Sequence, residues 1–232
     1  GILKSLLAQD PKSVMGHYYL GKIYGEMKLY KDASAWMEKA IALKPGFESA
    51  LSDLALLCEI QNETAKAREI YRQLIEEHPQ RMGYRLRLAK LDIREKKYNE
   101  AIGILEDVLK RDVRNREARL TLALALMETQ KPERAIEELN TLLASAPNDQ
   151  EARYFLGGAY EEKKMMAEAL REYERIPASS PLYGSAQVRA GYILKSQGKT
   201  GEAIEKAKKA LAEKKSDAAL YGLLAALYEA DG

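Results

Sequence analysis

The sequence has little of what cross-linked, metal-bound or membrane-spanning proteins need. One cysteine and two histidines among 232 residues exclude a disulfide framework and leave few ligands for a metal. The net charge of +2 gives no overall field to recruit nucleic acid or an anionic surface. No apolar run approaches the roughly 18 residues of a membrane span. We therefore expect no metal, no nucleic-acid partner and no direct membrane span. The compartment, cytoplasmic or periplasmic, stays open.

What the sequence does contain is a repeat with a period of 34 residues. Prolines recur at multiples of this interval: Pro11, Pro45, Pro79, Pro147 and Pro181. One series of small residues keeps the same step: Gly21, Ala55, Ala89, Ala123, Gly157, Gly191 and Ala225. A second series does so at another offset: Ala33, Ala67, Ala101, Ala135, Ala169 and Ala203. Three series in one register predict an array of identical structural units.

Each unit has the pattern of two helices joined by a short turn. In the first unit the two apolar faces are Leu20, Ile23 and Tyr24, then Met37, Ala40 and Ile41. This spacing is helical and not alternating, so no strand is expected. The small residues allow two helices to cross closely, at the usual axis separation of about 8–10 Å.

In this register Leu fills the seventh position of most units, and small residues fill the eighth and twentieth. Tyr24 and Tyr160 fill the eleventh position. The pattern resembles the tetratricopeptide repeat over essentially the whole chain, and regular bacterial-type arrays in particular. The usual bulky side chain at the fourth position is mostly missing. The resemblance implies an all-α fold, a right-handed α-α superhelix.

Six complete repeats follow from the register, with a half repeat at each end. The repeats are 14–47, 48–81, 82–115, 116–149, 150–183 and 184–217, and the half repeats are 2–13 and 218–230. Fourteen helices and a single domain over 1–232 are expected. The segment 218–230 is apolar on nearly every side, unlike a solenoid cap. It indicates either a fragment of a longer protein or a natural end that associates with itself or another partner.

The resemblance implies that the first helix of each repeat lines a concave groove. The side chains expected to contact a partner there are Tyr18, Lys22, Leu56, Ile60, Leu86, Lys90, Arg94, Leu120, Leu124, Met127, Tyr154 and Tyr192. The leucines, Ile60, Ile93 and Met127 would form an apolar strip suited to an amphipathic helix or extended peptide. Two alternatives remain: these residues belong to the core, or the strip packs on itself.

One tetratricopeptide subtype grips a carboxylate with lysine, asparagine and arginine at set positions. Those positions here hold Tyr18, Lys22, Asp53, Gly83 and Arg87. Asp53 would repel a carboxylate and the asparagines are absent, so this subtype is not expected.

Three arginines recur at the fourth position of consecutive units: Arg85, Arg119 and Arg153. They could bind acidic side chains or phosphates, or they could pair with carboxylates of adjacent helices. Candidates for that pairing are Asp92, Glu117 and Glu151.

Catalytic patterns are missing from the sequence. Gly198-Lys199-Thr200 resembles the end of a phosphate-binding loop, but Ile193 stands where the loop needs glycine. Cys58 falls at an apolar position of its unit and is expected to be buried and unreactive. We therefore expect no enzyme and no cofactor.

The function that the sequence favours is a protein–protein interaction scaffold that supports assembly of a multiprotein complex. A protein or peptide partner would bind in the concave groove. The alternatives are a regulatory or substrate-presenting domain of a larger enzyme, and a self-association module acting through residues 218–230.

Overall fold

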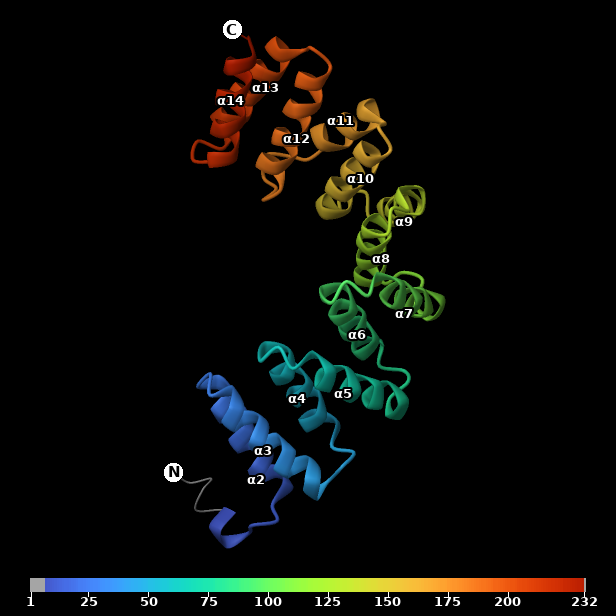
Figure 1. Ribbon diagram of the computed structural model, residues 1–232, viewed down its shortest axis with the longest axis vertical. Coiled ribbons are helices and arrows are strands. Elements are labelled where there is room, and N and C mark those ends of the chain that lie inside the picture. Colours follow the sequence, from blue (N-terminus) through green and yellow to red (C-terminus); the bar gives the residue numbers. More distant parts are fainter. Residues whose placement is uncertain (1–6, 232) are drawn as a thin grey trace. The chain divides into compact units, whose positions relative to one another are not determined.

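The computed structural model describes residues 7–231 of the chain (Figure 1). The chain divides into two compact units, Gly1–Val108 and Leu109–Gly232, and each is taken by itself below. All regular structure in the described part is helical. None of the described helices is long and apolar enough to cross a membrane.

The first unit contains the helices of repeats one to three. They are α2 (Val14–Glu26), α3 (Tyr30–Leu43), α4 (Glu48–Ile60), α5 (Thr64–Glu77), α6 (Met82–Arg94) and α7 (Tyr98–Arg111), the last of which crosses the boundary. Residues 7–9 are also helical and belong to the predicted half repeat 2–13; residues 2–6 of that prediction lie outside the described residues.

The second unit contains the remaining helices. They are α8 (Arg116–Glu128), α9 (Pro132–Ser145), α10 (Gln150–Glu162), α11 (Met166–Glu174), α12 (Tyr183–Ser196), α13 (Thr200–Glu213) and α14 (Ala218–Asp231). Consecutive helices pair as hairpins, as α8 with α9 and α10 with α11 show in Figure 1. In this unit the second helix of one hairpin also packs on the first helix of the next, as α9 does on α10 and α11 on α12.

The turn inside every hairpin repeats the same backbone geometry. The fifteenth residue of each of the six repeats has a left-handed φ: Lys28, Asn62, Lys96, Gln130, Lys164 and Gly198. At this residue the first helix ends in a Schellman motif, in which the next N–H reaches back to the carbonyl of the eleventh residue. Lys131 N donates to Leu126 O at 2.8 Å, and Lys199 N to Leu194 O at 3.0 Å.

Several first helices begin with a side-chain cap at the residue before them. Ser13, Asn115 and Asp149 each accept a hydrogen bond from the N–H three residues later. These side chains satisfy one of the N–H groups that an α-helix leaves unpaired at its start.

The core is shared between successive hairpins. In the first unit one cluster joins Leu54 of α4, Tyr71 and Leu74 of α5, and Leu88 of α6. In the second unit a cluster joins residues of α12, α13 and α14. The predicted all-α solenoid of 34-residue hairpins is confirmed. The single domain over 1–232 stays a prediction.

Replacing a glycine of the common turn and a glycine inside a helix should have opposite effects on stability. Gly198 has φ +74°, where a Cβ is strained, so Gly198→Ala should lower the free energy of unfolding by about 1 kcal/mol. Gly103 lies inside α7, and a Cβ added there meets nothing within 4 Å. Gly103→Ala should therefore raise stability by about 0.5–1 kcal/mol. Urea unfolding of both variants measures this, and a shift of equal sign in the two would contradict the turn geometry.

Candidate partner-binding surface

Two of the predicted groove residues meet at a carboxylate between α2 and α4. The Tyr18 hydroxyl donates to Asp53 Oδ2 at 3.1 Å, and Lys22 Nζ lies 3.5 Å from the same oxygen. Tyr18 also packs on Phe47, with ring centroids 5.1 Å apart. Burial and the neighbouring charge of Asp53 raise the pKa of Tyr18 above its ordinary value. The hydroxyl therefore stays protonated and acts as a donor.

Beside this contact lies a hollow of about 270 Å³, here called the α2–α4 hollow. It is lined by Gly21, Lys22, Gly25, Glu26, Tyr30, Met37, Asp53, Leu56, Leu57 and Ile60. Ile60 has 54% of its surface exposed, and Leu56 is half-buried. The hollow thus combines an apolar floor with Lys22, Glu26 and Asp53 at its edge, and three of the predicted residues, Lys22, Leu56 and Ile60, line it.

Two predicted residues lie in the core instead of on an open surface. Leu86 is 8% exposed and Leu120 is 6% exposed. Both occupy the fifth position of their repeats, where Tyr18 of the first repeat packs on Phe47, the residue just before α4. The expected contiguous apolar strip is therefore interrupted at these two leucines, which corrects that part of the prediction.

The other predicted residues of the two units are more accessible. Lys90 and Arg94 are exposed, and Arg94 Nη1 lies 3.6 Å from Glu59 Oε2. In the second unit Leu124, Met127 and Tyr154 are half-buried, and Tyr192 is 47% exposed. Their contact with a partner stays a prediction.

A pair of buried tyrosines beneath this surface was missed by sequence reasoning. Tyr71 and Tyr173 occupy the twenty-fourth position of repeats two and five, and each is 1% exposed. Each hydroxyl donates at 2.5 Å to the glutamate at the twelfth position, Glu59 or Glu161. The signal was available, because Glu stands at the twelfth position only in the two repeats with Tyr at the twenty-fourth.

The arginines at the fourth position have a structural role in all three repeats. Each guanidinium donates to the backbone carbonyl six residues earlier: Arg85 to Pro79 at 2.7 Å, Arg119 to Val113 at 2.7 Å and Arg153 to Pro147 at 2.6 Å. Each also pairs with an acid of its own second helix, namely Asp107, Glu138 and Glu172 respectively.

Structural pairing is thus confirmed, but two of the candidate carboxylates, Asp92 and Glu151, pair with other arginines. Asp92 pairs with Arg68, and Glu151 pairs with Arg116. The arginines turn toward the loop before their own helix because the carbonyl there needs a donor.

Cys58 is buried, as expected, with its sulfur 3.6 Å from Glu63 Oε2. Burial raises the pKa of its thiol to about 11, so the reactive thiolate is scarce at neutral pH. Within residues 7–231, no group of three or more His, Cys, Asp or Glu side chains is placed to hold a metal ion.

At the C-terminal helix α14, Tyr221 and Tyr228 are 55% and 49% exposed. Ala225 is exposed as well, although the eighth position is buried in all six complete repeats. Self-association through this face stays a prediction.

Two family models match the chain. The model for the tetratricopeptide repeat matches residues 92–151 and 132–190. The model described as anaphase-promoting complex, cyclosome, subunit 3 matches residues 26–108. The chain is a tetratricopeptide repeat protein.

Solved structures agree with this family on the fold. The C-terminal part of a TPR repeat-containing protein from Cytophaga hutchinsonii has a TM-score of 0.82 at 14% identity, covering 96% of this chain and 92% of that one. A tetratricopeptide repeat protein from Parabacteroides merdae has a TM-score of 0.67 at 20% identity, covering 97% and 90%.

Among curated proteins, Protein O-mannosyl-transferase TMTC3 from Homo sapiens is 35% identical over 77 residues. The match covers 33% of this chain but only 8% of the length of that relative.

The tetratricopeptide repeat is generally a non-catalytic scaffold for protein interaction, and this chain is a scaffold of that general kind.

The contacts of Arg119 generate a stability prediction. Its side chain is 11% exposed and holds both the Val113 carbonyl and Glu138. Arg119→Met should lower the free energy of unfolding by about 1–3 kcal/mol, because both partners lose their donor. Arg114 is exposed in the loop that contains Val113, so Arg114→Met serves as the matched control. Urea unfolding that gave the same small change for both would refute the structural role of Arg119.

Proposed function

We propose that this tetratricopeptide protein holds a peptide or helix of a partner protein against its first-helix surface and so supports assembly of a multiprotein complex. The α2–α4 hollow carries the proposal. Ile60 lines this hollow and has 54% of its surface exposed. An exposed apolar side chain beside an apolar hollow is typical of a contact site for an apolar side chain of a partner. The match of residues 26–108 to a model named for a subunit of a large complex also supports a role in assembly.

The edge of the hollow indicates which partner side chains fit. Lys22 is held by Asp53 at 3.5 Å, and Glu26 supplies a second negative charge. One lysine against two acids leaves the edge with a net charge of −1. A partner helix or peptide with an apolar side chain flanked by neutral or basic residues would be favoured, because like charges on the partner would be repelled.

Substitution of Ile60 tests this proposal. Ile60→Glu places a charge in the hollow at an exposed position, so the fold should be retained and partner binding weakened at least tenfold. Val113 is 66% exposed in a loop of the other unit, and Val113→Glu is the matched control. Affinity capture with quantitative mass spectrometry, followed by titration of the captured partner, measures the effect. Equal binding by the unaltered chain and Ile60→Glu would exclude the α2–α4 hollow.

A second candidate is a regulatory or substrate-presenting domain of a larger enzyme. The match of 77 residues to a small part of a transferase favours it. A catalytic domain encoded in the same reading frame would support this candidate, and a reading frame without one would exclude it.

A further inference from the structure

The fifth repeat departs from the others in its second helix. Five of the six second helices have 14 residues, whereas α11 has 9 and ends at Glu174. Pro177 explains the early end, because proline lacks an N–H and its ring clashes with the carbonyl four residues before it. The repeat keeps its length, so residues 175–182 stand where the other repeats have the last five helical residues and the following loop, and they are not an insertion.

This replacement segment has a defined conformation of its own. Ile176 is 1% exposed and anchors the segment in the core. Ser180 N donates to Pro177 O at 2.9 Å, and Leu182 N donates to Ser180 Oγ at 3.1 Å. The segment therefore forms a fixed wall, and what it encloses is part of the folded structure.

Between this wall and the start of α10 lies a hollow of about 1000 Å³, here called the α10 hollow. Its apolar walls are Ala146, Pro147, Tyr154, Phe155, Pro177, Pro181 and Leu182. Tyr154 and Phe155 meet edge to face, with centroids 5.9 Å apart. Walls of proline and aromatic rings suit a large apolar side chain, and this volume is in the range of known ligand sites.

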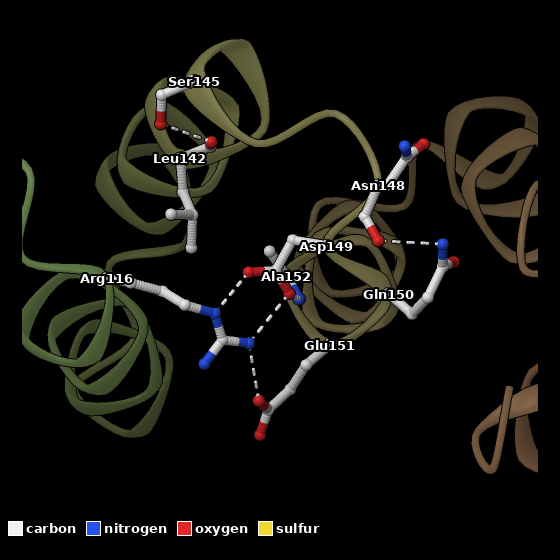
Figure 2. Close-up of polar contacts among 8 residues, drawn as sticks. All are labelled: Arg116, Leu142, Ser145, Asn148, Asp149, Gln150, Glu151 and Ala152. Carbon is white, nitrogen blue, oxygen red and sulfur yellow. Dashed lines mark hydrogen bonds and ion pairs between the residues drawn. The ribbon is translucent and has the colours of Figure 1, made fainter.

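The polar side of the α10 hollow is drawn in Figure 2. Arg116 of α8 donates to both oxygens of Asp149, at 2.5 and 2.9 Å, and to Glu151 Oε2 at 2.9 Å. Burial raises the pKa of Asp149, but the Arg116 guanidinium and the backbone N–H groups of Ala152 and Glu151 together outweigh it and hold this pKa below its ordinary value. Asp149 also caps α10 through the Ala152 N–H, at 3.0 Å.

The lining has an excess of negative charge. Its only charged members are Arg116, Asp149 and Glu151, so one positive charge faces two negative charges and the sum is −1. Asp149 is 6% exposed and committed to Arg116 and the helix cap, whereas Glu151 is 48% exposed. Glu151 is thus the carboxylate that a guest can reach, and it favours a basic guest over an acidic one.

Gln150 adds an acceptor that is not used. Its Nε2 donates to Asn148 O at 2.9 Å (Figure 2), while its Oε1 is shielded from solvent and has no hydrogen-bond partner among residues 7–231. If the side chain turned toward the hollow, this oxygen could accept an N–H from a guest. An extended peptide offers unpaired backbone N–H groups, whereas the interior of a helix does not.

We propose that the α10 hollow binds an extended peptide of a partner protein through a large apolar side chain, preferably aromatic, that is followed by lysine or arginine. The apolar side chain lies among Tyr154, Phe155 and Leu182, and the basic side chain pairs with Glu151. The proposal rests on the proposed function as a scaffold and assigns it a second contact, with the chemistry of the bound segment.

Titration of the ¹⁵N-labelled full chain with blocked peptides tests the assignment. The probe is acetyl-Gly-Ser-Phe-Lys-Ser-Gly-amide, and the comparison peptides replace Phe by Ala or Lys by Glu. Amide shifts should concentrate on residues 150–155 and 179–183. The Ala peptide should bind at least tenfold more weakly, because the buried apolar area is lost, and the Glu peptide about three- to tenfold more weakly. Equal affinities for the three peptides, or shifts elsewhere only, would overturn the proposal.

Three variants sharpen the result. Ser179 is exposed and lines the hollow, so Ser179→Trp should obstruct it and weaken binding of the probe at least tenfold. Ser216 is exposed in another loop and outside the lining, so Ser216→Trp should bind the probe like the unaltered chain. Glu151→Gln should reduce the preference for Lys over Glu in the peptide to less than twofold. Unchanged binding by Ser179→Trp would also overturn the proposal.

The experiments can exclude either of the two proposed sites without excluding the other. The Ile60→Glu chain should still bind the probe peptide, because Ile60 lies in the other unit. Loss of partner capture with Ile60→Glu, combined with no peptide binding, would remove the α10 hollow and leave the proposed function standing. Capture that Ile60→Glu leaves unchanged, combined with peptide binding at residues 150–155, would remove the α2–α4 hollow alone.

Discussion

A hairpin of 34 residues cannot bury its own apolar face, and this constraint governs the rest of the structure. Domains below about 40 residues rarely have enough core to fold by themselves. First helices such as α4 and α10 solve the problem by packing on a second helix on either side, α4 on α3 and α5, and α10 on α9 and α11. Ala55 and Ala89 at the eighth position are fully buried, and so, nearly, is Leu91 at the tenth, with 1% exposure. With these sides in use, a narrow face of each first helix remains for partners.

Because the apolar faces of the helices are used for packing, the recurring polar contacts lie in the turns and loops that connect the helices. A left-handed residue ends each first helix at the same position of all six complete repeats. Arginine at the fourth position ties three of the first helices to the preceding loop. These contacts join each helix to the turn or loop beside it, and they engage the three arginines within the fold instead of leaving them available to a partner.

The sequence predicted the repeat because its period is carried by many residues at once. It also placed Cys58 in the core, since one position in a repeat can be read against the same position in five others. The sequence could not show that the fifth position of a repeat is more buried than the ninth and the thirteenth. Leu86 and Leu120 are the same residue type as Leu56. They stand at the fifth position instead of the ninth, so they lie at a different angle around the helix axis and are buried. Sequence reasoning missed the early end of α11, for which Pro177 was the available signal, and the size of the α10 hollow depends on how residues 175–182 pack.

The sharing of core between neighbouring hairpins is tested most directly by hydrogen exchange on a chain with one weakened hairpin. Leu156 in α10 is 2% exposed, and Leu156→Ala should cost about 2–5 kcal/mol locally. Nearest-neighbour stacking predicts the greatest loss of amide protection in α9 to α12, a smaller loss in α14, and little change in α2 and α3. A uniform loss of protection in all helices would contradict the account and indicate a single cooperative core.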